Sequence, residues 1–180
     1  MWNSQVIVML LEGIRDTLYM TLASTLFGYI IGLPMGIVLT VTDKDGIRPN
    51  AAVYKVLDVI SNLLRSIPFI ILLIVLIPFT RFVVGRSYGS TATIVPLTIA
   101  AAPYIARMVE SSLKEVDAGV IEAARSMGAS DFQIVTKVML VEARTSLIVG
   151  ATISLGTILG YSAMAGTVGG GEIGRASCRE

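Results

Sequence analysis

The sequence of 180 residues has no histidine and a single cysteine, Cys178. Without histidine, a Ser-His-Asp or Cys-His nucleophilic site cannot be assembled from this chain. Zinc and most transition metals also lose their usual ligands. The carboxylates of one segment, which we interpret as a solvated charged face, are Glu110, Glu115, Asp117, Glu122 and Asp131. We therefore expect no catalytic residue and no metal site in this chain.

A phosphate-binding glycine loop is missing as well. The pattern G-x-x-x-x-G-K-[ST] does not occur, and the glycine run at 169–171 is followed by Glu172. Any nucleotide-driven work would need another subunit, so we do not expect an enzyme. The net charge of +1 and the lack of a basic run give no indication of a nucleic-acid partner.

Charged residues are scarce and unevenly placed. They make up 15% of the chain, against 54% hydrophobic residues, whereas soluble domains carry about a quarter charged residues. A spanning helix needs about 20 apolar residues. Three charge-free runs are long enough: 17–42, 87–106 and 145–171. A further apolar stretch lies between Arg65 and Arg81.

These runs predict an all-α integral membrane protein, a polytopic helical bundle with four spans in one domain at 1–171. A barrel is excluded because the runs are continuously apolar and do not alternate with period two. The spans are expected at 17–41, 56–80, 90–109 and 143–164. Lysine and arginine are richer in the loop at 42–55 and in 107–144 than on the opposite side. Positive-inside counting then places the amino terminus outside and these segments in the cytoplasm.

Two of the spans carry patterned faces. Glycines at Gly28, Gly32 and Gly36 lie on one helical face, which favours tight helix packing, with a moving seam as the alternative. In the last span a second face would either pack against another helix, which we favour, or line a translocation path gated by its bulky members. Its residues are Gly150, Ser154, Thr157, Tyr161 and Met164.

One cation lies close to an apolar core. Arg65 and Asp58 are seven residues apart on the same helical face. They could form an intramembrane pair. The alternative that we favour is an arginine that extends to the cytoplasmic surface.

Residues 122–138, EAARSMGASDFQIVTKV, look like soluble protein within this apolar chain. Gly128 predicts the end of one short helix, and Ser130 with Gln133 predicts a capping box that starts a second. Glu122 and Arg125 are placed to pair. The first helix would present Val120, Ala123, Ala124 and Met127, and the second would pack inward through Ile134, Val135, Val138 and Met139. An ordinary interfacial helix without a partner is the alternative.

The same stretch carries a resemblance to a known family. Glu122-Ala123-Ala124, Gly128, then Val138 and Leu140 resemble the EAA loop of binding-protein-dependent ABC importer permeases, although Val141 replaces the proline of that pattern. The runs RSIPFIILL, IPFTR, IVPLTIAAAPYIARMVE and GYSAMAGTVGGG are similar to the methionine-type subgroup. The likeness covers roughly residues 10 to 171.

The resemblance implies a permease subunit that imports an amino acid, methionine or a close analogue, across the bacterial cytoplasmic (inner) membrane. It implies that the cytoplasmic loop at about 110–141 is a coupling segment, with Glu122, Ala123, Ala124 and Gly128 contacting an ABC ATPase. A second permease copy, an extracytoplasmic substrate-binding protein and membrane lipid would be the other partners. ATP and Mg would bind the ATPase, and this chain would bind no cofactor. The alternatives are an ion-coupled secondary transporter and a non-transporting membrane assembly protein.

The chain ends differently from this family, which continues into a fifth span. Residues 172–180, EIGRASCRE, match the translation of a common sequencing adapter in this frame. We therefore expect this tail to be non-native and the transmembrane domain to be truncated.

Overall fold

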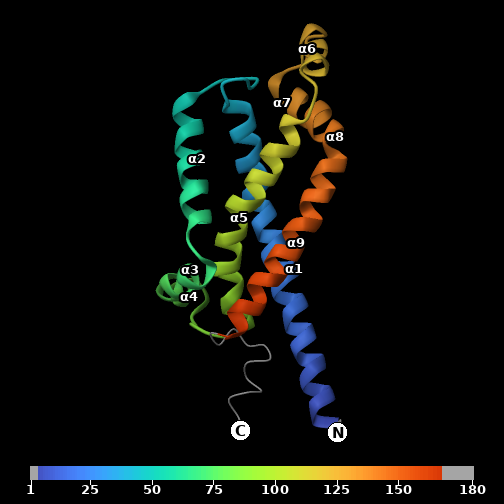
Figure 1. The fold of residues 1–180 in the computed structure, drawn as a ribbon. Coiled ribbons are helices and arrows are strands. Elements are labelled where there is room, and N and C mark those ends of the chain that lie inside the picture. Colours follow the sequence, from blue (N-terminus) through green and yellow to red (C-terminus); the bar gives the residue numbers. More distant parts are fainter. Residues whose placement is uncertain (1–3, 168–180) are drawn as a thin grey trace. The chain divides into compact units, whose positions relative to one another are not determined.

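The computed structural model describes residues 4–167, and this part of the chain is all-helical. The glycine run at 169–171 and the tail at 172–180 lie outside these residues. The helices, shown in Figure 1, are α1 (Ser4–Thr42), α2 (Ala51–Ser66), α3 (Phe69–Val75), α4 (Ile77–Val84), α5 (Ser90–Lys114), α6 (Ala118–Ser126), α7 (Asp131–Gln133), the π-helix η1 (Ile134–Met139), α8 (Leu140–Glu142) and α9 (Arg144–Thr167).

Three helices are long and apolar enough to cross a membrane. They are Ile7–Thr42 of α1, Ser90–Lys114 of α5 and Arg144–Gly166 of α9. These helices correspond to the predicted first, third and fourth spans. The first begins well before residue 17, because the helix continues through the charged residues Glu12, Arg15 and Asp16.

The predicted span at 56–80 is not one continuous helix. The chain forms the bent pair α2 and α3 instead, which counts as a fourth span only if both are taken together. Pro68 stands at the N-cap of α3, and a proline disfavours the helical conformation of the residue before it, here Ile67. A second break follows at Leu76, after which α4 begins with Pro78 in its first turn.

The chain divides into two compact units, each built from separated segments. Of the described residues, the first contains 4–28, 66–101 and 154–167. The second contains 29–65 and 102–153. Within the second unit, α2 returns alongside the end of α1, and the tip formed by α6 and α7 follows α5 (Figure 1).

Close backbone contact joins α1 and α5 in the second unit. A Cβ atom added at Gly32 would lie 2.7 Å from the carbonyl oxygen of Ala102, and one added at Gly36 would lie 2.6 Å from that of Ala106. Any side chain at either glycine would push the helices apart. Gly28, the third glycine of the predicted face, is buried in the first unit.

The three long helices differ in how much of their apolar surface is covered. Each of these helices contains an 18-residue apolar stretch. Of this stretch, 67% is buried in α5, against 28% in α1 and 22% in α9. Large hydrophobic side chains such as Leu22, Leu26 and Ile148 are therefore exposed. Surfaces of this kind require lipid or another chain to cover them.

Candidate functional site

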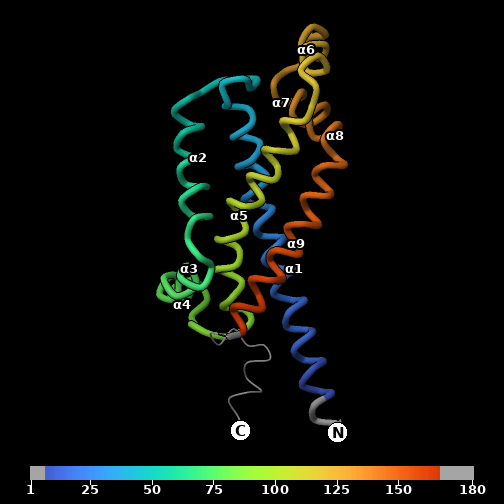
Figure 2. Tube along the Cα trace, in the orientation of Figure 1, coloured from blue at the N-terminus to red at the C-terminus, as the bar shows by residue number. Residues whose placement is uncertain are grey.

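The segment that follows α5 forms a sharply bent tip, as predicted. The side chain of Asp117 caps α6 by accepting a hydrogen bond from the backbone N–H of Gly119. Gly128 has a φ of 84°, in the left-handed region that other residues adopt only with strain. The capping box of Ser130 and Gln133 then starts α7. Figure 2 traces the chain through this turn between α6 and α7.

The second helix of the tip anchors it to the rest of the second unit. Ile134, Val135 and Met139 are buried and Val138 is half-buried, which confirms the predicted inward face. These residues form the π-helix η1, which the sequence analysis did not predict. A π-helix widens the turn by one residue and is frequent at functional sites.

The outer surface of the tip is apolar. Met127 is 82% exposed, Phe132 is 76% exposed, and Val120 and Ala123 are exposed beside them. Ala124, in contrast, is buried, so the expectation that both alanines face outward is wrong. Phe132 was missed by the sequence analysis, although a large apolar residue two positions after the capping serine was a usable signal. We call Val120, Ala123, Met127 and Phe132 the tip surface.

Arg125 holds the tip against the loop that follows α1. Its Nη2 donates a hydrogen bond to the carbonyl oxygen of Ile47 at 3.0 Å and lies 3.8 Å from Oδ1 of Asp131. The anticipated pairing with Glu122 on the same helix is therefore replaced by contacts across the turn and to a distant loop. Both Arg125 and Glu122 line a cleft of about 450 Å³ beneath α6, together with Asp43, Lys114 and other residues of the second unit.

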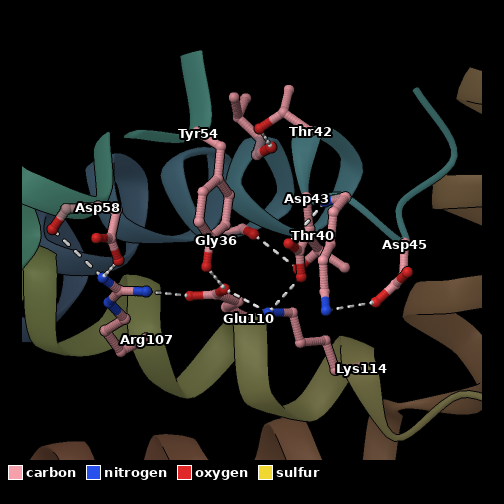
Figure 3. A network of polar contacts seen from close by, with 12 residues as sticks. Gly36, Thr40, Thr42, Asp43, Asp45, Tyr54, Asp58, Arg107, Glu110 and Lys114 are labelled. Atoms are coloured by element: carbon pink, nitrogen blue, oxygen red, sulfur yellow. Dashed lines mark hydrogen bonds and ion pairs between the residues drawn. The ribbon is translucent and has the colours of Figure 1, made fainter. Parts of the chain in front are cut away.

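Five charged side chains from three segments form a continuous chain of ion pairs next to this cleft (Figure 3). We call it the ion chain; in order it contains Asp58, Arg107, Glu110, Lys114 and Asp43. Arg107 Nη1 lies 2.7 Å from Glu110 Oε2, and Lys114 Nζ lies 2.8 Å from Glu110 Oε1 and 2.7 Å from Asp43 Oδ2. The hydroxyl of Tyr54 also donates to Glu110 Oε1 at 3.3 Å.

The ion chain connects the end of α1, α2 and α5. Arg107 pairs with Asp58 on α2 and also donates to Asn62 Oδ1 at 3.1 Å. Arg65 is exposed and is not the partner of Asp58, so the pairing of these two residues is not observed. Glu110 is only 4% exposed, and its interpretation as part of a solvated face is wrong. A buried carboxylate with two cationic partners is strongly tied to its position.

Asp43, at one end of the ion chain, lies directly after the last residue of α1. The Lys114 ammonium donates a hydrogen bond to Asp43 and holds the pKa of that carboxyl below its ordinary value. Within the described residues, no group of three carboxylate, histidine or cysteine side chains is placed to hold a metal ion.

The candidate path residues lie along α9 in the first unit, where their burial differs. Ser154 is fully buried, Thr157 and Tyr161 are half-buried, and Met164 is exposed. The ring of Tyr161 stacks on Phe69 of α3 with the centroids 4.9 Å apart. This contact ties α9 to the short helix after the break in the chain.

Comparison with known proteins identifies the family. Residues 17–177 match the family described as the inner membrane component of binding-protein-dependent transport systems. The chain belongs to this family. The match decides against an ion-coupled secondary transporter or a non-transporting assembly protein. It also agrees with the resemblance that the EAA-type motif carries.

Relatives within this family are similar over most of their length. The D-methionine transport system permease proteins MetI of Salmonella typhimurium strain LT2 and of Escherichia coli strain K12 are each 54% identical to this permease over 158 residues, which is 88% of this chain and 73% of theirs. A solved structure described as an inward-facing conformation of the MetNI methionine ABC transporter superposes with a TM-score of 0.94 at 52% identity. It covers 97% of this chain and 81% of that one.

Proposed function

We propose that this chain is the permease subunit of an ATP-driven importer that moves methionine or a close analogue across the bacterial inner membrane. The family assignment supplies the transport class, and the relatives named as D-methionine permeases support the substrate. The apolar helices α1, α5 and α9 would form part of the membrane passage.

The proposed assembly contains an ABC ATPase, a second permease copy and an extracytoplasmic substrate-binding protein. The exposed apolar faces of α1 and α9 leave large surfaces for the second copy and for lipid. ATP and Mg belong to the ATPase in this proposal, and no enzymatic step is assigned to the permease. The surplus of lysine and arginine in 42–55 and 107–144 supports a cytoplasmic coupling segment and an external amino terminus.

The tip surface is the proposed contact with the ATPase. The observation that carries this proposal is the exposure of Met127 and Phe132 on either side of the turn at Gly128. Large apolar side chains held at such exposure favour a partner protein. Ala123 is exposed beside them and small enough for close approach, whereas Gly128 contributes the turn geometry.

Movement of the tip would reach the long helices through fixed contacts within the second unit. The buried residues of η1 hold the tip, Arg125 joins it to the loop after α1, and the ion chain joins that loop to α5 and α2. When the ATPase subunits close on ATP, a shift of the tip would therefore act on α1, α2 and α5 together. The packed and ion-paired contacts would resist separate movement of these helices.

The substitution Met127→Arg tests this contact. It places a charge on the tip surface at a side chain that is 82% exposed, so no buried space is filled and the permease should still insert. We expect loss of ATPase co-purification and of ATP-driven methionine uptake in proteoliposomes. The matched control is Val53→Arg, an exposed apolar position on α2 outside the tip surface. Retained co-purification and uptake in Met127→Arg would refute the coupling assignment.

A further inference from the structure

A second cleft, in the first unit, has no role in the coupling account. Its volume is about 430 Å³, and it is lined by Arg15, Asp16 and Tyr19 of α1, by Arg86, and by residues at the start of α5. The two arginines come from segments far apart in the sequence. Neither forms an ion pair within the described part of the chain, and both side chains are exposed.

The acidic residue in this cleft is already engaged. Oδ2 of Asp16 accepts a hydrogen bond from the Ser90 hydroxyl at 2.8 Å. The hydroxyl contact holds the carboxylate but does not neutralise the two guanidinium groups. The cleft thus retains an excess of positive charge, and guanidinium groups favour phosphate because they can donate two parallel hydrogen bonds.

The arginines also lie just before the start of two charge-free runs. The charge-free run 17–42 begins directly after Arg15 and Asp16, and the run 87–106 begins directly after Arg86. About 20 helical residues cross the hydrocarbon core, so the run 87–106 places the cleft at its boundary with the headgroups, where the longer helix α1 carries Arg15 and Asp16. Tyr19, which is 49% exposed, has the amphipathic character typical of this depth.

We propose that the Arg15–Arg86 cleft is a binding site for the phosphate of a phospholipid headgroup. The acyl chains would lie along the neighbouring exposed apolar surface of α1, which includes Leu18 and Leu22. The headgroup charge would meet both guanidinium groups. The site lies on the side proposed as extracytoplasmic. Its residues belong to the first unit, whereas the tip surface belongs to the second.

Native mass spectrometry tests this site. The permease is extracted together with its ATPase and its second copy, and the complex is delipidated. The probes are phosphatidylglycerol and a diacylglycerol with the same acyl chains but no phosphate. We expect phosphatidylglycerol to bind and diacylglycerol not to bind. Arg15→Gln/Arg86→Gln should weaken phosphatidylglycerol binding about tenfold or more, because charge-assisted hydrogen bonds are lost.

Two further variants separate loss of the site from loss of the fold. Arg15→Lys/Arg86→Lys keeps both charges but loses the paired guanidinium donors, so it should bind more weakly than the unchanged protein and more tightly than the double glutamine variant. Arg81→Gln removes an exposed arginine of α4 that does not line the cleft, and it should bind as the unchanged protein does. If the double glutamine variant fails to assemble, Arg86→Gln alone is used, and a partial loss is expected.

Several results would overturn the proposal. Unchanged phosphatidylglycerol binding in the glutamine variants would exclude the arginines as ligands. Equal binding of diacylglycerol would show that the acyl chains alone are recognised. Displacement of the lipid by millimolar inorganic phosphate would identify a free anion as the occupant. Loss of substrate-binding-protein affinity with unchanged lipid binding would assign the cleft to a protein partner.

Discussion

Arg107 of α5 donates hydrogen bonds both to the carboxylate and to the backbone carbonyl oxygen of Asp58 on α2. The same guanidinium pairs with Glu110. Glu110 also pairs with Lys114, and Lys114 pairs with Asp43. One face of α5 thus fixes the positions of two other segments. The residues on this face recur at intervals of three and four, so a single helix can present them all.

Glu110→Ala should destabilise the permease by about 3 kcal/mol, because it leaves two cations of the ion chain without their shared buried partner. The measurement is the thermal unfolding of the purified protein in detergent, with methionine uptake recorded in parallel. Glu115→Ala is the control, since Glu115 is an exposed carboxylate five residues further on. Equal stability of the two variants would show that the ion chain contributes nothing.

Gly32→Ala should destabilise the helix pair α1 and α5 by about 1–3 kcal/mol. The new methyl group would meet the Ala102 carbonyl oxygen at 2.7 Å, and the backbone cannot yield as a flexible side chain can. Gly156→Ala makes the same change on α9, where a Cβ meets no atom within 4 Å. That control should be neutral or slightly stabilising. Unfolding of both variants is compared, and equal losses would contradict the close-packing account.

Asp43→Asn should lower the free energy of unfolding only at pH values where the Asp43 carboxylate is ionised. Lys114 lowers the pKa of Asp43 in the folded state, so this pair stabilises the fold above the ordinary carboxyl pKa. The contribution is lost as the pH falls through the folded-state pKa. We expect a loss of about 0.5–1 kcal/mol at pH 7. The difference from the unchanged protein should shrink below about pH 4. An unfolding difference that is constant with pH would contradict this assignment.

Ser154→Trp tests the candidate path on α9. Ser154 is fully buried, so the large indole would fill any passage along this face and should abolish methionine uptake. Met164→Trp, at an exposed position on the same helix, is the comparison and tests whether the path extends that far. Assembly is checked by co-purification of the ATPase. Unimpaired uptake by a correctly assembled Ser154→Trp protein would rule out the path and leave packing as the role of this face.

The local features of the tip were predictable because they depend on neighbouring residues. The turn at Gly128 and the capping box of Ser130 and Gln133 follow from backbone geometry and from hydrogen bonds three residues apart. The charge-free runs likewise predicted three long apolar helices. The break at Pro68 had a local signal in the proline itself, but the continuous apolar composition outweighed it in the prediction of a single span.

The features that sequence reasoning missed depend on distant segments. Asp58 and Arg107 are 49 residues apart, and their pairing requires the return of α2 alongside α5. Arg107, Glu110 and Lys114 could have been recognised as one helical face, but the burial of Glu110 depends on α1 and α2. The opposite exposures of Ala123 and Ala124 follow from the rotation of α6 against its neighbours, which a short helix does not encode by itself.

Site-directed cross-linking from adjacent positions of α6 tests the central claim most directly. Ala123→Cys and Ala124→Cys are each made in a Cys178→Ser background and assembled with the ATPase. The account predicts cross-links to the ATPase from the exposed position 123 and none from the buried position 124, with the yield from 123 changing when ATP is added. An intact complex that gives no cross-link from position 123 would contradict the assignment of this tip as the coupling surface.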